Sequence, residues 1–277
     1  MSSEKMLSIS DKEFTQLADY VKRNYGINLS TKKKTLVMGR LQNVLALRGI
    51  NSFSEYYNYV ISDVTGDAAT TLINKLTTNH TFFMRESKHF EYFRSKVLPY
   101  LTASYAGQKD LRIWSAGCST GEEAYTLAMI VAEYFGMEKR YWDAKILATD
   151  ISSKVLEIAA KGIYSGEQTE SLPEKWKNSY LRRLDSERSM FVEDIRNEVI
   201  FRKFNLMNAQ YPFKKKFHVI FCRNVMIYFD SKVKAELIEK FYEFTEPGGY
   251  LFIGHSESLN REDMKYKYVL PAVYRKE

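Results

Sequence analysis

The feature that most constrains the fold of this chain is a regular alternation, from Leu111 onward, of short apolar runs with longer amphipathic segments. The runs are rich in Ile, Val and Phe, and they read LRIWSA, AKILATD, EVIFRKFNL, FHVIFCRN and GGYLFIGH. Several of the segments between them have helix length, for example SKVKAELIEKFYEF. Because strands with helix-length connections pair in parallel, we predict an α/β domain whose parallel sheet is covered by helices on both faces. The last run, YKYVLPAVYRK, suits an antiparallel closing strand, and the stretch RSMFVEDIRNEVIF suits a small hairpin.

The part of the chain before residue 77 has a different pattern, which predicts helices only. In SDKEFTQLADYVKRNYG the apolar residues recur at helical spacing, Ser10 and Glu13 suit a capping box, and Gly26 suits a helix end. The same pattern recurs in STKKKTLVMGRLQNVLALRG, which ends at Gly49. The apolar positions on one face of this second helix are Val37, Leu41, Val44 and Leu45. The stretches SFSEYYNYVIS and AATTLINKLTT predict two more helices, so we expect a small helical domain here.

The distribution of charge bears on the partner. The chain has 41 Lys and Arg residues against 34 Asp and Glu residues, a net charge of +7. From Lys22 to Arg48 there are seven basic residues and no acidic one. An electropositive helical domain attracts an acidic partner, and the pattern by itself leaves nucleic acid, a membrane surface and an acidic protein face open.

Composition argues against several classes of protein. No apolar run approaches the length of a membrane span, and the start, MSSEKMLSIS, lacks the apolar core of a signal peptide. Two cysteines, Cys118 and Cys222, cannot build a disulfide framework, so we expect a cytoplasmic protein. The histidines, at positions 80, 89, 218 and 255, have no close metal-ligand spacing, and no metal is expected.

The junction WSAGCSTGEEAY, which follows the first apolar run, suits two kinds of chemistry. As Gly117-x-Ser119-x-Gly121 it has the form of a hydrolase nucleophile elbow with Ser119 as the nucleophile. That elbow normally follows a strand well inside the sheet, whereas this one follows the first convincing strand of the chain. His255 follows a later strand, but no acid is clearly placed to complete a triad with it. We therefore favour the second interpretation, a loop that forms the floor of a nucleotide-cofactor site.

The cofactor interpretation follows from where ligands bind in open parallel sheets, at the carboxyl ends of the strands. The small residues Ser115, Ala116 and Gly117 allow the backbone to approach a ligand closely. Asp150 ends the second run, in LATDIS, where a carboxylate can accept hydrogen bonds from both hydroxyls of a ribose. Asp150 also has an alternative role as the N-cap of the helix that follows, and the two roles are compatible.

The residues around the loop favour a cofactor without phosphates. The dinucleotide fingerprint Gly-x-Gly-x-x-Gly is absent, and Glu122 and Glu123 would repel a pyrophosphate at the start of the helix. S-adenosylmethionine carries an ammonium and a sulfonium group, which tolerate nearby carboxylates. The sequence therefore predicts S-adenosylmethionine as the cofactor and S-adenosylhomocysteine as its product.

The motifs of the whole chain resemble, in order, those of the CheR family of chemotaxis receptor glutamate O-methyltransferases. They are TTNHTFFMRE (77–86), WSAGCSTGEEAY (114–125), ATDIS (148–152), AAKGIY (159–164), FNLM (204–207), IFCRNVMIYF (220–229) and PGGYLFIGHSES (247–258). The resemblance implies a Rossmann-like class I S-adenosylmethionine-dependent methyltransferase domain at 111–277, with a small β-subdomain inserted at about 165–198. It further implies an all-α receptor-recognition domain at 1–76, joined through a linker and connecting helix at 77–110 that contribute to the cofactor site.

The resemblance also implies roles for individual residues. Arg85 and Tyr228 are the implied catalytic residues, with Arg85 near the carboxylate of the cofactor, of the acceptor or of both. The implied cofactor-binding residues are Asn79, Thr81, Arg85, Ala116, Gly117, Glu123, Asp150, Asn205, Leu206, Arg223 and Asn224. The implied receptor-binding residues are Lys32, Lys33, Lys34, Arg40 and Arg48.

The implied reaction is methylation of specific glutamate side chains on the cytoplasmic helical bundle of chemotaxis receptors, giving glutamyl methyl esters. The stretch RRLDSERSMFVEDIRN contains no glycine, unlike family members that dock a receptor's C-terminal pentapeptide, so a pentapeptide-independent enzyme is expected. We also expect a monomer without metal, nucleic acid or direct membrane insertion.

Two alternatives remain from the sequence. The first is a methyltransferase acting on nucleic acid or on another protein. Nucleic-acid enzymes that methylate amino groups commonly carry an Asn/Asp-Pro-Pro-aromatic loop, and this chain has CRNVMIYF instead. The second alternative is a non-catalytic module that binds S-adenosylmethionine and signals by docking a partner.

Overall fold

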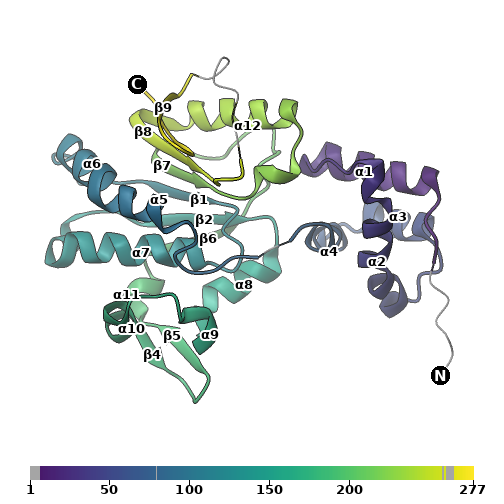
Figure 1. The fold of residues 1–277 in the computed structure, drawn as a ribbon, viewed down its shortest axis with the longest axis horizontal. Coiled ribbons are helices and arrows are strands. Elements are labelled where there is room, and N and C mark those ends of the chain that lie inside the picture. The colour runs from purple at the N-terminus through teal and green to yellow at the C-terminus, as the bar shows by residue number, and fades with distance from the viewer. Residues whose placement is uncertain (1–6, 79, 258, 260–264) are drawn as a thin grey trace. The chain divides into compact units, whose positions relative to one another are not determined.

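The computed structural model describes residues 7–78, 80–257, 259 and 265–277, and it divides the chain into two compact units. The first unit contains residues 1–79 and 228–233, and the second contains residues 80–227 and 234–277. Figure 1 labels the helices and strands of both units. Asn79, a predicted cofactor ligand, lies outside the described residues. No helix of the described residues is long and apolar enough to span a bilayer.

The first unit is helical, as predicted. Its elements are α1 (Asp11–Tyr25), η1 (Thr31–Lys33), α2 (Lys34–Arg48), α3 (Phe53–Ser62) and α4 (Asp67–Leu76). The capping box of Ser10 and Glu13 is present at the start of α1, and Gly26 ends that helix with a φ of 72°. Val37, Leu41, Val44 and Leu45 of α2 are all buried. The predicted apolar face of the second helix is therefore confirmed.

The second unit holds a main sheet of seven strands and a smaller sheet of three strands. Its elements up to the small sheet are α5 (Ser87–Tyr92), η2 (Phe93–Val97), α6 (Leu98–Ser104), β1 (Ile113–Ala116), α7 (Glu122–Phe135), η3 (Gly136–Tyr141), β2 (Ile146–Asp150) and α8 (Ser153–Lys161). The small sheet and its helices are β3 (Ile163–Ser165), α9 (Gly166–Thr169), α10 (Glu174–Tyr180), β4 (Leu181–Arg183), β5 (Arg188–Phe191) and α11 (Glu193–Arg196). The remaining elements are β6 (Val199–Lys203), β7 (Phe217–Cys222), η4 (Met226–Tyr228), α12 (Ser231–Glu243), β8 (Thr245–Ile253), β9 (Lys267–Leu270) and β10 (Val273–Arg275). The end of η4 and the start of α12 belong to the first unit.

The main sheet has the order β6-β2-β1-β7-β8-β10-β9, and its first five strands are parallel. Ile113 of β1 pairs with Ile146 of β2 on one side and with Val219 of β7 on the other. The chain thus runs from β1 to β2 in one direction and later places β7 on the opposite side of β1. The carboxyl ends of β1 and β7 form the switch point where such sheets bind ligands.

Helices cover both faces of this sheet, which confirms the predicted α/β architecture. Alternate residues of a strand point to opposite faces, so Trp114 and its neighbour Ser115 lie on different sides. Trp114 packs against Phe241 of α12, with ring centroids 5.4 Å apart. Phe221, which pairs in register with Ser115, packs against Phe90 of α5.

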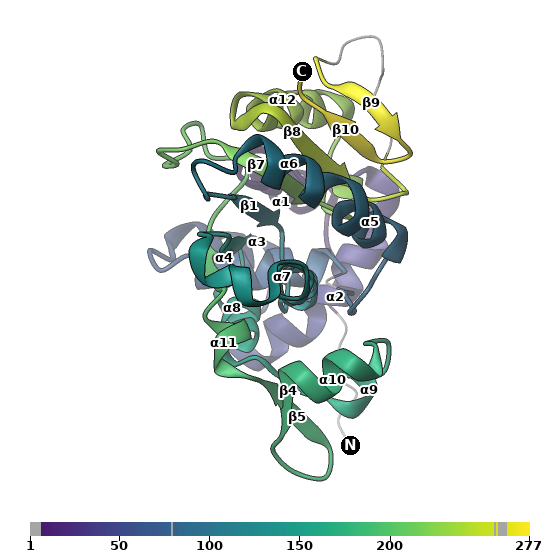
Figure 2. The same cartoon turned by 90° about the vertical axis from the view of Figure 1, so that its left-hand side faces the viewer.

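Two details of the C-terminal half differ from the sequence predictions. The predicted closing strand is a hairpin of two strands, β9 and β10, because the chain turns at Ala272 with a φ of 64°. The hairpin predicted within RSMFVEDIRNEVIF pairs β5 with β4 instead. The residues EVIFRK form β6, because apolar Val199 pairs beside Ile146 in the main sheet. Figure 2 shows the small subdomain, with β4, β5, α9 and α10, lying beyond α7 and apart from that sheet.

Candidate functional site

The loop between β1 and α7 packs closely at the carboxyl end of the main sheet. Gly117 and Gly121 have φ values of 85° and 97°, in the left-handed region that favours glycine. A Cβ atom on Gly117 would lie 2.4 Å from Cγ2 of Val225. The backbone N–H groups of Gly117 and Cys118 donate to the carbonyl of Thr149 at 2.8 and 2.9 Å. The loop is therefore held against both the end of β2 and the segment after β7.

Asp150 ends β2 beside this loop, and its carboxylate is held by two backbone donors. Oδ2 accepts from the N–H of Ser119 at 2.9 Å, and Oδ1 accepts from the N–H of Ser152 at 3.0 Å. Burial raises the pKa of Asp150, although these N–H groups act in the opposite direction. The N-cap of α8 is Ser152, so the capping role considered for Asp150 is wrong. A carboxylate offers about four lone-pair sites, which leaves Asp150 acceptor capacity for a ribose diol.

The structure also bears on the hydrolase alternative. The hydroxyl of Ser119 is buried and has no hydrogen-bond partner among the described residues. A serine nucleophile requires a base within hydrogen-bond reach, and none accepts from this hydroxyl. The Gly-x-Ser-x-Gly pattern therefore marks a tight loop here.

Glu123 lies in the first turn of α7, where its carboxylate is bound from two sides. Ser115 Oγ of β1 donates to Oε1 at 2.7 Å, and Arg223 NH1 lies 3.3 Å from Oε2. Burial raises the pKa of Glu123, and the Arg223 guanidinium and the Ser115 hydroxyl oppose that shift. The predicted acidic group is thus at the carboxyl end of β1, next to Ala116.

Arg223 follows β7, and its side chain is only 2% exposed. Its guanidinium pairs with Glu86 at 3.1 Å and with Glu123 at 3.3 Å. It also donates to the backbone carbonyl of Arg85 and lies over the ring of Phe90. The resemblance implies Arg223 as a cofactor ligand, a role that stays a prediction, and in the structure its guanidinium contacts these protein groups. Arg223 therefore links the segment before α5 to the ends of β1 and β7.

The segment before α5 carries Arg85 in an unusual backbone conformation. Met84 and Glu86, on either side of Arg85, have φ values of 59° and 56°. Such left-handed non-glycine residues are strained and persist where surrounding contacts hold them. The Arg85 guanidinium donates to the carbonyl of His80 at 2.6 Å, and it has no ion pair with any described carboxylate. Thr81 lies in the same segment, half-buried.

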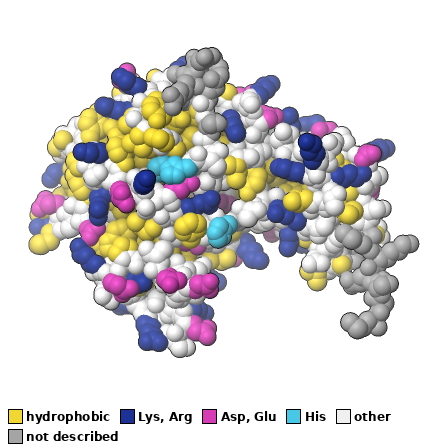
Figure 3. Space-filling view, viewed as in Figure 1, with side chains coloured by type: hydrophobic (Ala, Val, Ile, Leu, Met, Phe, Trp, Pro, Cys, Tyr) yellow, Lys and Arg dark blue, Asp and Glu magenta, His cyan; other side chains and the backbone are white. Residues whose placement is uncertain are grey.

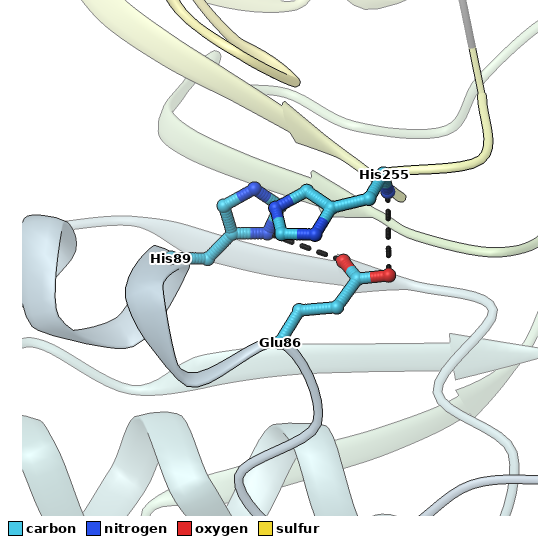
Figure 4. Close-up of side chains that lie close together, drawn as sticks. All are labelled: Glu86, His89 and His255. Carbon is cyan, nitrogen blue, oxygen red and sulfur yellow. Dashed lines mark hydrogen bonds and ion pairs between the residues drawn. The ribbon is translucent and has the colours of Figure 1, made fainter.

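Glu86, His89 and His255 meet where α5 begins and β8 ends (Figure 4). Their possible ligand atoms lie within 4.8 Å of one another, a proximity that the histidine spacing in the sequence did not indicate. The Glu86 carboxylate lies 3.4 Å from Nδ1 of His89 and accepts the backbone N–H of His255 at 3.2 Å. Burial lowers the pKa of His89 to about 4, so its ring is neutral near pH 7. Because Arg223 also pairs with this carboxylate, we interpret the cluster as part of the ion-pair network.

Asn205 and Leu206 follow β6 and lie close to the end of β2. The N–H of Phe204 donates to the carbonyl of Asp150 at 2.9 Å, which fixes this segment beside the acid. Leu206 is buried, and the Asn205 side chain accepts from the N–H of Met207 at 2.9 Å. An apolar side chain beside a fixed amide is suited to hold an adenine ring next to its ribose.

Asn224 lies directly after Arg223, with a φ of 60°. Its side-chain Nδ2 lies 3.4 Å from Oε1 of Glu86, and its backbone N–H donates to the carboxylate of Glu257 at 3.0 Å. Neither glutamate was assigned a role from the sequence. Their partners lie 138 and 33 residues away along the chain, so no local pattern reveals them.

The remaining predicted residues lie in the first unit. The Tyr228 hydroxyl contacts the backbone N–H and carbonyl of Thr78, at 2.9 and 3.2 Å. Arg40 donates to the carbonyl of Leu76 at 2.9 Å, so it caps the end of α4. Lys34 pairs with Asp11 at 2.5 Å.

The other predicted receptor-binding residues differ in their contacts. Arg48 lies over the ring of Tyr59 at 4.7 Å. Lys32 and Lys33, in η1, form no ion pair with any described residue. Figure 3 shows Lys and Arg side chains on the visible face of this unit.

Comparisons with known proteins identify the family of this chain. The family model of the CheR methyltransferase all-alpha domain matches residues 12–77, and that of the CheR methyltransferase SAM binding domain matches residues 79–274. The chain is 43% identical to the chemotaxis protein methyltransferase of Borreliella burgdorferi, over 98% of this chain and 96% of the relative. It is 34% identical to the chemotaxis protein methyltransferase of Escherichia coli, over 97% of this chain and 92% of the relative. The chain therefore belongs to the CheR methyltransferase family, and it is an S-adenosylmethionine-dependent methyltransferase of chemotaxis.

Proposed function

We propose that this enzyme transfers the methyl group of S-adenosylmethionine to glutamate side chains on the cytoplasmic helical bundle of chemotaxis receptors. The observation that carries the proposal is the Asp150 carboxylate, fixed by two backbone N–H groups at the carboxyl edge of the parallel sheet. The named relatives support a role in chemotaxis. The product would be a glutamyl methyl ester, with S-adenosylhomocysteine released.

The charge of the site supports a cationic cofactor. The carboxylates of Asp150, Glu123 and Glu86 lie at this edge, and the guanidinium of Arg223 pairs with two of them. The Arg85 guanidinium also acts on Glu123, so three carboxylates stand against two guanidinium groups. A negative surplus in a partly buried site disfavours phosphates and favours ammonium and sulfonium groups. Asp150 would hold the ribose hydroxyls, and Glu123 would lie near the methionyl ammonium.

The proposed chemistry requires positioning more than acid–base catalysis. Bound S-adenosylmethionine supplies an electrophilic methyl group on a positively charged sulfur. A glutamate carboxylate is already ionised near neutral pH, so no general base is needed, and the departing sulfur becomes neutral, so no general acid is needed. The carboxylate oxygen forms a bond to the methyl carbon as the carbon–sulfur bond breaks. Orientation alone provides effective molarities of ~10⁵–10⁸ M in well-aligned intramolecular reactions.

Arg85 is proposed to hold a carboxylate of the cofactor or of the acceptor. We expect Arg85→Ala to lower kcat/KM for receptor methylation about 100-fold while thermal unfolding shifts little, because this guanidinium has one backbone partner and no paired carboxylate among the described residues. The matched control is Arg94→Ala, an exposed arginine on η2 paired only with Glu133. Unchanged turnover of Arg85→Ala would refute its role.

The helical unit is proposed to recruit acidic receptor helices through Lys32 and Lys33. Charge reversal of both lysines is expected to raise the KM for receptor at least threefold at low salt and to leave S-adenosylhomocysteine affinity unchanged. Arg40 is excluded from this test because its reversal would disrupt the end of α4. Reversal of Lys109 and Lys145, exposed residues at the opposite end of the sheet, controls for net charge. Equal receptor kinetics in the two double variants would contradict the proposal.

We further propose that recognition does not need a receptor's C-terminal pentapeptide. The loop between β4 and β5, residues 184–187, contains no glycine. The Asp185 carboxylate closes it by accepting the N–H groups of Glu187 and Arg188, at 2.9 and 2.8 Å.

The decisive experiment for the proposed function is transfer of labelled methyl groups to receptor-bearing membranes, measured as base-labile methanol. Receptors with and without their last five residues should be methylated at equal rates. Label in nucleic acid would support the first alternative function. Tight cofactor binding without any transfer would support a non-catalytic module.

A further inference from the structure

Asn224 is held in a backbone conformation that is costly for a residue with a side chain. Its φ of 60° lies in the left-handed region, which asparagine tolerates better than most residues but which still has a conformational cost. It directly follows Arg223 at the end of β7. A strained residue at this edge needs contacts that determine its geometry.

Glu257 provides those contacts from beyond the end of β8. Glu257 is only 4% exposed. Its Oε2 accepts the N–H of Asn224 at 3.0 Å and the N–H of Gly254 at 2.6 Å. Burial raises the pKa of this carboxyl, while the N–H groups of Gly254, Asn224, Met226 and Ile227 oppose the shift. Because Oε2 accepts backbone N–H groups from the segment after β7 and from the end of β8, it ties the two segments together.

Close packing on the other side of Asn224 leaves little freedom for its amide. A Cβ atom on Gly254 would lie 2.5 Å from Nδ2 of Asn224 and 2.8 Å from its backbone nitrogen. Nδ2 also lies 3.4 Å from Oε1 of Glu86. The amide is thus confined between the end of β8 and the start of α5.

We propose that Glu257 is a positioning residue that sets cofactor affinity by fixing Asn224, an inference that rests on the proposed site. Glu257 itself does not touch the reacting groups. It anchors the turn after β7, so that the Asn224 amide is already oriented before the cofactor binds. Without this anchor, binding must also order the turn, and affinity falls.

The test is a double-mutant cycle on binding of S-adenosylhomocysteine, measured by calorimetry. Glu257→Ala is expected to weaken binding about tenfold, and Glu257→Gln, which keeps one acceptor oxygen, about threefold. In an Asn224→Ala background, Glu257→Ala is expected to add less than about twofold, because its effect acts through Asn224. Glu239→Ala, at a half-exposed carboxylate on α12 that pairs with Lys265, is the control.

Each outcome decides the proposal. Additive losses in Glu257→Ala and Asn224→Ala would overturn it, as would unchanged affinity in a folded Glu257 variant. If Glu257→Ala does not fold, the same cycle is measured with Glu257→Gln. Its loss of S-adenosylhomocysteine affinity in the wild-type background is then compared with its loss in the Asn224→Ala background. A wild-type chain that binds no S-adenosylhomocysteine would refute the proposed function, a result distinct from failure of the cycle.

Discussion

Replacing Asp150 by Ala is expected to weaken binding of S-adenosylhomocysteine by roughly 100- to 1000-fold, the largest loss from any single carboxylate of the site. The reason is that one carboxylate would accept from two ribose hydroxyls. Hydrogen bonds to a charged acceptor contribute ~1.5–3 kcal/mol each, and two of them at the lower end of that range, ~3–4 kcal/mol together, correspond to the expected loss. Turnover at saturating cofactor should fall far less than affinity, because Asp150 would not touch the transferred methyl group.

Stability is the readout that separates binding from folding in this variant. Burial raises the pKa of Asp150, so the ionised group is held at a cost in the folded protein. Removing the carboxylate removes that cost, but it also leaves the N–H groups of Ser119 and Ser152 without their acceptor, so the two effects on stability oppose each other. We therefore expect the free energy of unfolding to change by no more than about 2 kcal/mol. The control is Asp143→Ala, an exposed acid at the opposite end of the sheet, and equal affinities in both variants would rule out the ribose role.

Replacing Arg223 by Met is expected to lower both stability and cofactor affinity. Removal of one partner of a buried ion pair typically costs ~3–5 kcal/mol, because the remaining charge is left uncompensated. Here two carboxylates, of Glu86 and Glu123, would lose the same partner, and the carbonyl of Arg85 would lose a donor. The strained segment from Met84 to Glu86 would then keep the Asn224 contact but lose the Arg223 contacts that tie it to the end of β7. Chemical denaturation and calorimetry measure the two effects.

The pH dependence of the Arg223→Met variant provides a second test. In the wild-type protein burial raises the pKa of Glu123, and Arg223 opposes that shift, so its removal should raise the folded-state pKa further. When the pKa of a carboxyl is higher in the folded protein than in the unfolded chain, the free energy of unfolding falls as pH rises from the unfolded-state pKa through the folded-state pKa. The stability deficit should therefore be larger at pH 7.5 than at pH 5.

A second substitution should compensate for part of this loss. Glu123→Gln in the Arg223→Met background removes one unpaired charge, so it should restore part of the stability without restoring full affinity. The same stability deficit at both pH values, together with no rescue by Glu123→Gln, would show that Arg223 does not stabilise the ionised carboxylate of Glu123.

The sequence by itself determined the parts of this protein that depend on local or periodic patterns. Ser10, Glu13 and Gly26 predicted the ends of α1, because caps are satisfied within a few residues. The apolar runs predicted the parallel sheet, because strand length and connection length are readable along the chain. The position of Asp150 followed as well, since the end of a parallel strand lies at the ligand-binding edge.

Only the tertiary structure decided which charged side chains pair with one another. Arg223 and Glu86 are 137 residues apart, and nothing in the sequence shows that this guanidinium pairs with the carboxylates of Glu86 and Glu123. The role of Glu257 and the split of the last run into β9 and β10 likewise depended on packing. The physical reason is that a buried charge takes the partner that the fold brings within about 3 Å, and that distance is set by strand order and register.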